Sequence, residues 1–442
     1  MKQINTLSWI CLVLSISSCA NSQSDNKSEE KDSVVTTVNT LGLPKPYETK
    51  SAINFSKVIG WPAGKQPKAP RGFTVSKFAD GMRSARWIYQ LPNGDILVSQ
   101  ANTEPKGLKK VESVVSGQSQ SAHTTGSPNQ ITLLRDANKD GAPELQEVFL
   151  AGLNKPFGML LIGNTFYVAC TDGMWKYPYK TGETRLSGEG KKILDLPEGG
   201  YNNHWTRNIL ANKNNSKIYI TVGSGSNVGE HGMDNEVRRA NILEINPDGS
   251  GERIYASGLR NPVGMGWAPG TDVLWTAVNE RDELGNDLVP DYMTSVKEGG
   301  FYGWPYSYYG KNLDPRIKEK DQNPGLVNKA IVPDVPLDSH TASLGLAFYT
   351  NHMFPEKYQG GVFIGQHGSW NRKDLTGYRV AFVPFKNGIA AGPPEDFLTG
   401  FIANREKSEV YGRPVGVTVL QDGSLLVADD ASDVLWRVTY KN

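Results

Sequence analysis

Cysteine is scarce in this chain: Cys11, Cys19 and Cys170 are the three that occur among 442 residues. Cys11 lies in an apolar leader and Cys19 directly follows it, so Cys170 is left for the rest of the chain. A disulfide framework is therefore excluded for the folded part, and a hydrophobic core must stabilise it. Residues 51–442 are long enough to bury such a core.

An excess of charge of either sign is also missing. Lys and Arg number 47, Asp and Glu number 46, and the formal net charge is +1. A nucleic-acid-binding protein needs a basic excess to neutralise phosphates, so no nucleic-acid partner is expected. Beyond the leader, no apolar run approaches the roughly 20 residues of a transmembrane helix.

The first residues have the layout of an export signal. Met1 and Lys2 form a short positive start, and Leu7–Ile16 form an apolar stretch too short to span a membrane. The stretch ends in Ile16-Ser17-Ser18-Cys19, which resembles the lipobox of bacterial lipoproteins, where the cysteine carries diacylglycerol. We predict a lipoprotein signal peptide at residues 1–18 and lipidation of Cys19. A plain secretory signal is the alternative.

Residues 19–50 are rich in Ser, Asp, Lys, Glu and Thr and contain few large apolar side chains. Such a segment cannot bury enough surface to offset its chain entropy, so it is predicted to be a flexible tether. Ala20 follows the cysteine, and this is not the aspartate of an inner-membrane retention signal. We expect an exported protein, attached to the outer membrane by lipid alone and facing the periplasm.

From Arg71 onward the chain consists of short β-rich runs separated by Gly, Pro, Asn and Asp. Six of them share one plan, an apolar strand, a tight turn and a second apolar strand, and begin at Ala85, Pro156, His204, Pro262, Ala342 and Pro414. The turns Asn93-Gly94, Gly163-Asn164 and Asp422-Gly423 suit tight hairpins. A single such unit cannot bury its own faces, so six of them predict an all-β, six-bladed β-propeller over residues 51–442.

A ring of blades needs a closing contact. The short strand that starts at Arg71 has no hairpin partner nearby, and we predict that it pairs with the last strand, which starts at Val434. A β-sandwich array is the alternative, but the six units lack linker-like breaks. The segment Gly299–Asp338 is rich in Pro, Tyr and Gly and is predicted to be a long loop over the face where propellers bind ligands.

Polar residues stand just before several inner strands. They are His204, the pair Arg260 and Asn261, and Arg413. A propeller arranges equivalent positions around one axis, so we expect these side chains to converge on one mouth. There His204 suits a general base, and converging arginines suit a carboxylated ligand. The alternative is a loop histidine with one hydrogen bond and arginines paired with local acids such as Glu280 or Asp282.

Two further stretches add candidate residues. Residues 279–293 are dense in carboxylates and amides, which suit calcium. Residues 366–380 place Arg372 and Lys373 just beyond a predicted strand, and the indole of Trp304 suits stacking on a flat ring.

Taken together, several motifs resemble those of the sorbosone dehydrogenase-like quinoproteins. They are His204-Trp-Thr-Arg, Gly258-LRNPVGM, Asn279-ERDELGNDLVPDY, Gly303-Trp304-Pro305 and Gly365-QHGSWNR. More remotely the chain is similar to soluble glucose dehydrogenase dependent on pyrroloquinoline quinone (PQQ) and to fungal pyranose dehydrogenases. The resemblance extends from about Arg71 to the C-terminus.

The resemblance implies a PQQ-dependent oxidoreductase that oxidises an aldose or a related sugar or aldehyde and passes electrons to a cytochrome or quinone. It implies His204 as general base and Arg260 as the group that stabilises developing charge. The cofactor-binding residues it implies are Asn261, Trp304, Arg372, Lys373 and Arg413. It also implies calcium at the quinone, although the stretch after Asn279 lacks the Gly-Pro pair of the glucose enzyme, which leaves those ligands open.

A second calcium motif lies in the loop from Asp136 to Glu147. It fits the EF-hand pattern at every specified position, and its candidate ligands are Asp136, Asn138, Asp140, Glu144 and Glu147. Its flanks are strand-like rather than helical, which suits a loop within a propeller hairpin. We predict bound calcium here; a polar turn without metal is the alternative.

Two other functional classes are alternatives to a dehydrogenase. A calcium-dependent propeller lactonase needs an acid before the first inner strand, where this chain has Ser84-Ala85-Arg86-Trp87. A non-enzymatic binding propeller needs neither His204 nor the arginines. Both fit the residues less well than a dehydrogenase.

Overall fold

The computed structural model describes residues 42–105, 107–123 and 126–441. By its contacts the chain divides into two units, residues 1–33 and 34–442, and every described residue belongs to the second. The predicted signal peptide, Cys19 and the predicted tether up to residue 41 lie outside the described residues. Within the described ranges, no helix is long and apolar enough to cross a membrane.

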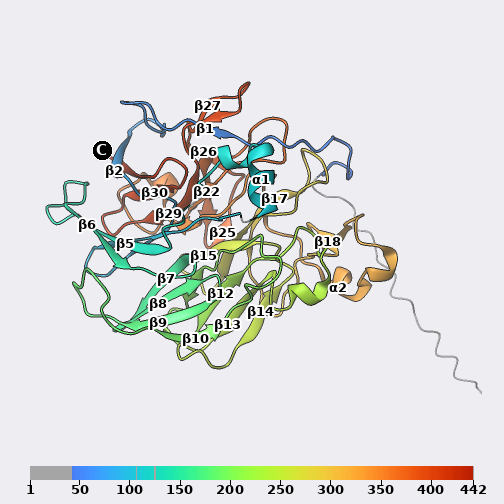
Figure 1. Ribbon diagram of the computed structural model, residues 1–442, viewed down its shortest axis with the longest axis horizontal. Helices are drawn as coiled ribbons and strands as arrows, with labels where there is room; N and C mark the ends of the chain where they lie inside the picture. The colour runs from blue at the N-terminus through green and yellow to red at the C-terminus, as the bar shows by residue number, and fades with distance from the viewer. Residues whose placement is uncertain (1–41, 106, 124–125, 442) are drawn as a thin grey trace, which may run out of the picture. The chain divides into compact units, whose positions relative to one another are not determined.

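Four-stranded antiparallel sheets make up most of the described chain (Figure 1). Blade 1 consists of β3 (Ala85–Gln90), β4 (Ile96–Gln100), β5 (Gln130–Arg135) and β6 (Leu145–Leu150). Blade 2 consists of β7 (Pro156–Ile162), β8 (Thr165–Cys170), β9 (Gly173–Pro178) and β10 (Lys191–Asp195). Blade 3 consists of β11 (Ile209–Ala211), β12 (Ile218–Val222), β13 (Asn241–Ile245) and β14 (Arg253–Ser257).

The second half of the chain repeats the plan. Blade 4 consists of β15 (Pro262–Trp267), β16 (Leu274–Val278), β17 (Pro290–Ser295) and β20 (Val335–Ser339). Blade 5 consists of β21 (Ala347–Phe348), β22 (Val362–Gln366), β23 (Arg379–Val383) and β26 (Glu395–Leu398). Blade 6 consists of β29 (Pro414–Val419), β30 (Leu425–Asp429), β31 (Val434–Tyr440) and, from the start of the chain, β2 (Phe73–Ala79).

The inner strands of the blades form a closed ring. In chain order each packs against the next, β3 on β7, β7 on β11, β11 on β15, β15 on β21 and β21 on β29, and β29 returns to β3. The closing strand β2 pairs with β31, from Phe73 opposite Tyr440 to Ala79 opposite Leu435. The predicted six-bladed propeller, with an N-terminal strand paired to the last blade, is confirmed.

A Pro-x-Gly motif begins three of the inner strands and brings the blades close together at the axis. A Cβ on Gly158 would lie 2.6 Å from the backbone nitrogen of Ile209 in blade 3, and one on Gly416 would lie 2.6 Å from the carbonyl oxygen of Arg86 in blade 1. Contacts this short exclude any larger residue. The strand register also shifts at these motifs, as at a β-bulge. Neighbouring inner strands therefore approach backbone to backbone.

Between the blades lie layers of apolar and aromatic side chains. Trp87 of blade 1 contacts Phe157 of blade 2, with ring centroids 5.0 Å apart. Phe73 of the closing strand makes edge contacts with Phe354 and Phe397 of blade 5. Cys170 is free and buried, and its burial raises the pKa of the thiol. The core is therefore apolar packing between blades, as the scarcity of cysteine requires.

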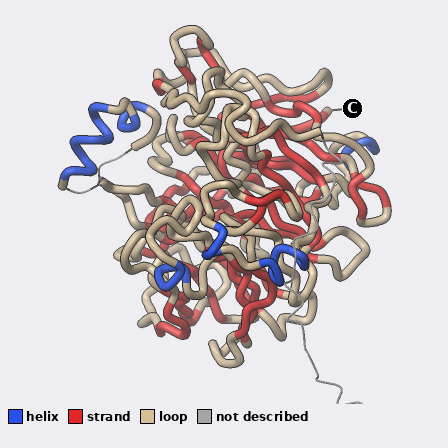
Figure 2. The backbone as a smooth tube through the Cα atoms, turned by 90° about the vertical axis from the view of Figure 1, so that its right-hand side faces the viewer, coloured by secondary structure: helices blue, strands red, loops and turns tan. Residues whose placement is uncertain are grey.

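Short elements lie in the connections, and Figure 2 shows the helices as short separate pieces among the loops. The helical ones are α1 (Leu108–Val115), η1 (Gln118–Gln120), η2 (Met233–Glu236), η3 (Glu319–Asp321), α2 (Pro324–Lys329) and η4 (Glu356–Tyr358). The short strands are β1 (Lys57–Val58), β18 (Ser307–Tyr308), β19 (Asn312–Leu313), β24 (Phe385–Lys386), β25 (Ile389–Ala390), β27 (Ile402–Asn404) and β28 (Glu409–Val410). The predicted loop 299–338 is not structureless: it contains β18, β19, η3 and α2, and its end belongs to β20.

Residues 42–50, the described end of the predicted tether, are held on the propeller. The backbone nitrogen of Tyr47 donates to the carbonyl oxygen of Leu284 at 2.8 Å, and that of Asn286 donates to the hydroxyl of Thr49 at 2.9 Å. A flexible tether makes no such contacts, so the tether cannot include these residues. Polar composition alone concealed them, because their partners come from a loop of blade 4.

Candidate functional site

His204 lies ahead of β11, at the end of the propeller where the inner strands begin. Its ring Nδ1 is 2.8 Å from the carbonyl oxygen of Ser224, which can only accept, so Nδ1 carries the proton and donates. The neutral ring then keeps its lone pair on Nε2. Burial, followed by the nearby Arg260 cation, lowers the pKa of His204 to about 3. The ring is thus held neutral, in the tautomer that accepts a proton at Nε2.

Asn261 lies beside His204 because a glycine separates them. A Cβ on Gly223, just after β12, would lie 2.5 Å from the Cβ of His204 and 2.4 Å from Oδ1 of Asn261. Within the described chain, this buried Oδ1 has no hydrogen-bond partner. A buried acceptor without a partner costs free energy. Asn261 is therefore well placed to accept a hydrogen bond from a ligand.

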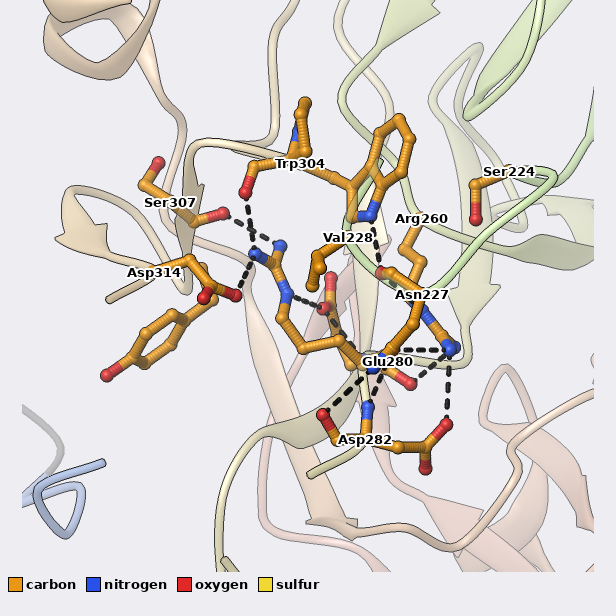
Figure 3. Close-up of polar contacts among 12 residues, drawn as sticks. Ser224, Asn227, Val228, Arg260, Glu280, Asp282, Trp304, Ser307 and Asp314 are labelled. Carbon is orange, nitrogen blue, oxygen red and sulfur yellow. Dashed lines mark hydrogen bonds and ion pairs between the residues drawn. The ribbon is translucent and has the colours of Figure 1, made fainter. Parts of the chain in front are cut away.

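Arg260 is 2% exposed, and all five of its N–H groups are bonded to protein oxygens (Figure 3). Nε donates to the carbonyl of Asn227 at 3.3 Å, and Nη1 donates to the carbonyls of Asn279 at 3.3 Å and Glu280 at 2.6 Å. Nη2 donates to Oδ1 of Asn227 at 2.9 Å and to Asp282 at 3.1 Å. The guanidinium can therefore act on a ligand through its charge, but it has no donor left to offer.

The bonds of Arg260 also decide whether residues 279–281 can bind calcium. The carbonyl oxygens of Asn279 and Glu280 already accept from the Arg260 guanidinium, and the side chains of Glu280 and Arg281 pair with each other at 3.0 Å. A metal ion at these carbonyls would be in contact with a buried cation, which is strongly unfavourable at low dielectric. The stretch does not fit a calcium site.

Asp282 connects Arg260 to a second buried cation. One carboxylate oxygen accepts from Arg260, and the other is 3.3 Å from Nδ1 of His340. Nε2 of His340 is 2.8 Å from the carbonyl oxygen of Gly285. Both partners accept, so both ring nitrogens donate and the ring is an imidazolium. Burial opposes this charge, but the bond to Asp282 raises the pKa of His340. Two cations around one carboxylate leave net positive charge beside His204.

Trp304 is connected to Arg260 through Asn227. It is 3% exposed, and its indole nitrogen donates to the carbonyl of Asn227 at 2.9 Å (Figure 3). From the same connection between β17 and β20, Arg316 donates to the carbonyl of Asp282 at 2.7 Å. The predicted loop 299–338 therefore forms a wall of the site, as expected, but its tryptophan is buried in protein.

A cavity of about 260 Å³ lies at the same end of the propeller. Its lining includes Phe55, Arg86, Trp205, His367, Trp370 and Arg413. Trp205 directly follows His204 in the chain, so the cavity and the His204 group are neighbours. The residues before the inner strands therefore form two adjoining groups, His204 with Arg260 and Asn261, and Arg413 with the cavity.

Among the residues that the structure describes, no acid is bonded to the side chain of Arg413. Its side chain donates from Nε to the carbonyl of His367, from Nη1 to that of Ser121 and from Nη2 to that of Gly368, each at 3.0 Å. All three partners are uncharged. The guanidinium thus presents positive charge to the cavity, which suits an anionic ligand.

Arg86, Asp430 and His367 form a hydrogen-bonded group in the same cavity. Arg86 pairs through Nη1 with Asp430, while its buried Nε has no partner among the described residues. Nε2 of His367 is 2.8 Å from the other oxygen of Asp430. Burial, followed by the charge of Arg413, lowers the pKa of His367 to about 4. His367 is therefore neutral, and the cavity keeps an excess of positive charge.

The structure does not bring Arg372 and Lys373 to this cavity. Arg372 pairs with Asp287 at 2.7 Å and lines a different surface cavity of about 400 Å³. The backbone of Lys373 bonds to Asn54 and Asn286. The chain turns sharply after Trp370, so residues two and three positions further on point elsewhere. The expectation that Arg372 and Lys373 hold the cofactor is not supported.

The loop between β5 and β6 brings three of its five candidate calcium ligands together. Side-chain oxygens of Asp136, Asp140 and Glu144 lie within 4.8 Å of one another. Asn138 contacts Asp140 at 3.1 Å, whereas Glu147 extends toward Arg185 at 3.4 Å. The cluster lies at the far end of a blade 1 hairpin and is separate from the His204 group.

Comparison with known proteins agrees with this geometry. A sequence model of the glucose/sorbosone dehydrogenase family matches residues 179–376, which contain His204, Arg260 and Trp304. An uncharacterized protein of Borreliella burgdorferi is 31% identical over 307 residues, which are 65% of this chain and 76% of that protein. This chain belongs to the glucose/sorbosone dehydrogenase family.

Further matches are a named bacterial enzyme and two solved structures. The aldose sugar dehydrogenase YliI of Escherichia coli is 28% identical over 181 residues, 41% of this chain and 43% of that protein. Two solved structures share the fold. The PQQ domain of pyranose dehydrogenase from Coprinopsis cinerea has a TM-score of 0.66 at 19% identity and covers 87% of this chain and 100% of its own. A family AA12 enzyme of Trichoderma reesei has a TM-score of 0.69 at 17% identity, with 88% and 99% covered.

Several residues of the site were not predicted from the sequence. Arg86 is the second residue of β3, the inner strand of blade 1, and lies close to the position before an inner strand that singled out Arg260 and Arg413, so the repeat itself could have found it. Asp430 and His340 carry no such signal, because each matters only through partners that are distant in the sequence. Phe55 precedes the repeats altogether.

Proposed function

We propose that this protein oxidises an aldose, or a related sugar or aldehyde, with PQQ as its bound oxidant. The observation that carries the proposal is His204, a neutral histidine with its free lone pair on Nε2, beside net positive charge in a propeller of the glucose/sorbosone dehydrogenase family. Membership of that family supports an oxidoreductase that acts on sugars. A lactonase lacks support, since Arg86 stands where its acid would be.

The residues of the cavity fit PQQ, which is a flat tricarboxylate. Arg413 and the free Nε of Arg86 offer positive charge and a donor for carboxylates. Trp205 and Trp370 line the same cavity and offer aromatic surface to a flat ring system. The unpartnered Oδ1 of Asn261 offers an acceptor near His204. PQQ also appears in the names of solved relatives from Coprinopsis cinerea and Streptomyces coelicolor.

The chain's own residues then divide the chemistry. When bound, PQQ supplies the acceptor for the hydride that leaves C1 of the sugar. Nε2 of His204 takes the proton of the C1 hydroxyl, which converts a cyclic aldose to its lactone. The N–H groups of Arg260 are all bonded to protein oxygens. Its positive charge keeps His204 neutral and stabilises negative charge that develops near it. Reconstituting the protein with PQQ and following dye reduction across aldoses and aldehydes tests the proposal; no turnover with any of them would refute it.

Arg413→Gln is expected to weaken PQQ binding by about tenfold or more, because a charge-assisted partner of a carboxylate is worth ~1.5 to 3 kcal/mol. Titration of the cofactor-free protein, followed by quenching of tryptophan fluorescence, measures the affinity. Arg372→Gln is the matched control: its guanidinium pairs with Asp287 outside the cavity, so its affinity should be unchanged. Equal losses in both variants would show that Arg413 has no particular role in binding.

We also propose that the loop from Asp136 to Glu147 binds calcium as a structural ion. The double variant Asp136→Asn and Asp140→Asn should lower thermal stability in calcium but not in chelator, since a ligand stabilises only the state it binds, by about 2.7 kcal/mol at 100 times its Kd. Thermal unfolding in both conditions measures this. Asp248→Asn, in a tight turn outside the cluster, is the control. A loss of the same size in chelator would mean that the aspartates only shape a turn.

We also propose a lipid anchor and a class of electron acceptor. A lipidated Cys19 would hold the protein at the periplasmic face of the outer membrane, and a Cys19→Ala variant should then leave the detergent phase on phase partitioning. The electrons taken from the sugar need an acceptor, for which a periplasmic cytochrome or a quinone is suited.

A further inference from the structure

The N-terminal segment that includes residues 51–61 runs along the end of the propeller where the cavity lies. In Figure 1 the blue chain passes from the right of the view, by β1, to β2 at the left. Asn371 donates to the carbonyl of Ala52 at 3.3 Å, and the backbone nitrogen of Asn54 donates to the carbonyl of Trp370 at 2.7 Å. The hydroxyl of Ser408 donates to Oδ1 of Asn54 at 2.7 Å. This part of the segment is thus bonded to blade 5 and to the connection that follows it.

The segment is also held on the other side of Phe55. β1 pairs in parallel with β28, with Lys57 opposite Glu409. Further along, the indole nitrogen of Trp61 donates to Asp429 at 2.9 Å, and Asp429 directly precedes the cavity residue Asp430. Backbone and side-chain bonds therefore determine where Phe55 lies from both directions.

Phe55 adds an aromatic wall to the cavity. Its ring stacks on that of Trp370, with centroids 5.4 Å apart and planes 8° from parallel. Both residues are only half-buried and both line the cavity. The charged groups Arg86, Asp430 and Arg413 line it as well. The cavity thus combines a cationic region, suited to the carboxylates of a cofactor, with a stacked pair of uncharged aromatic rings.

We propose that Phe55 is a specificity-determining residue and that its ring, backed by the stacked ring of Trp370, is the platform on which the ring of an aldopyranose substrate rests. The inference rests on the sugar oxidation proposed above. One face of a pyranose ring presents C–H groups, which are attracted to the negative face of an aromatic ring. Phe55 comes from the segment that crosses the end of the propeller and carries no charge, so within the cavity it suits an uncharged substrate rather than the carboxylates of the cofactor.

The test compares Phe55→Ala and Phe55→Leu with the wild type loaded with PQQ. Steady-state dye reduction is measured with aldopyranoses such as glucose and xylose and with the small substrate glycolaldehyde. In Phe55→Ala we expect kcat/KM for the aldopyranoses to fall by about tenfold through KM, the scale of one aromatic contact, while that for glycolaldehyde stays within about twofold. Phe55→Leu preserves the bulk but not the ring, so it should resemble Phe55→Ala. Phe55→Trp should keep wild-type selectivity.

The outcomes separate the two proposals. Equal losses for aldopyranoses and glycolaldehyde, or a wild type that oxidises glycolaldehyde but no aldopyranose, would overturn the role of Phe55 and leave the oxidation standing. A wild type that oxidises neither would refute the oxidation. In that case calorimetric titration of glucose and xylose into the protein still decides about Phe55: binding that Phe55→Ala weakens supports the platform, and absence of binding, or unchanged binding, overturns it.

Discussion

His204→Ala is expected to reduce turnover by ~10² to 10⁴, the usual contribution of a positioned general base, while PQQ binds with nearly wild-type affinity. The physical reason is that His204 keeps a free lone pair on Nε2, which can accept a proton. The charges suited to the cofactor's carboxylates belong to Arg413 and Arg86. Cofactor affinity comes from fluorescence titration, and turnover comes from dye reduction at saturating PQQ.

His352→Ala is the matched control for this variant, because His352 is exposed in a connection of blade 5. Its turnover should equal that of the wild type. If His204→Ala also kept wild-type turnover at saturating cofactor, another base would be required. His367, bonded to Asp430 in the cavity, would be the first candidate.

The pH profile gives a second measurement of the same residue. An unperturbed histidine loses its function as a base when pH falls through its ordinary pKa near 6.5. Burial, followed by Arg260, lowers the pKa of His204 to about 3, so the ring stays neutral well below pH 6. The log of kcat/KM should therefore be flat from neutral pH to about pH 5 and should decline only as pH approaches the lowered pKa. A decline centred near pH 6.5 would contradict the assignment of this base.

Arg281→Leu is expected to lower the free energy of unfolding by about 3 to 5 kcal/mol, the typical result of removing one partner of a buried ion pair. The side chains of Arg281, Glu280 and Asp314 are 0%, 1% and 0% exposed, with Arg281 at 3.0 Å from Glu280 and 3.2 Å from Asp314. Arg281 also donates to the carbonyl of Ser307 at 2.8 Å. Its loss would leave a buried carboxylate unpaired and would release the connection that carries Trp304.

Denaturant unfolding measures this loss, and two further variants interpret it. Arg185→Leu removes an exposed partner of Glu147 and should change stability by no more than about 1 kcal/mol. The double variant Arg281→Leu and Glu280→Leu should be more stable than Arg281→Leu, because the second change removes the unpaired carboxylate. A single variant as stable as the wild type would show that the pair contributes nothing.

Those features of the fold that depend on neighbouring residues were predictable. The tight turns at Gly94, Gly163 and Gly423 have the positive φ that their sequences indicate. The unpaired run at Arg71 indicated a closing strand, because a strand without a hairpin partner must find one elsewhere in a closed ring. The boundary of the tether was not predictable in this way, because residues 42–50 are polar in composition and their partners belong to blade 4.

The candidate site was predictable in position but not in bonding. The repeat indicated that His204, Arg260 and Arg413 lie at one end of the propeller, and they do. It could not indicate that every donor of Arg260 is bonded to a protein oxygen, nor that Arg372 pairs with Asp287 away from the cavity. The carbonyl oxygens concerned come from loops whose course no local periodicity describes.

By itself, the sequence determined a six-bladed ring, its closure, and the end of the ring at which His204 stands. These follow from alternation of apolar residues, from glycine at turns and from repetition, all of which act over short stretches of chain. Tertiary structure alone decided which charges are satisfied and which remain free to meet a ligand. It also brought Phe55, which precedes every blade, onto Trp370 at the cavity. The physical reason is that burial and hydrogen bonding depend on what packs against a side chain, and here those partners come from distant parts of the sequence.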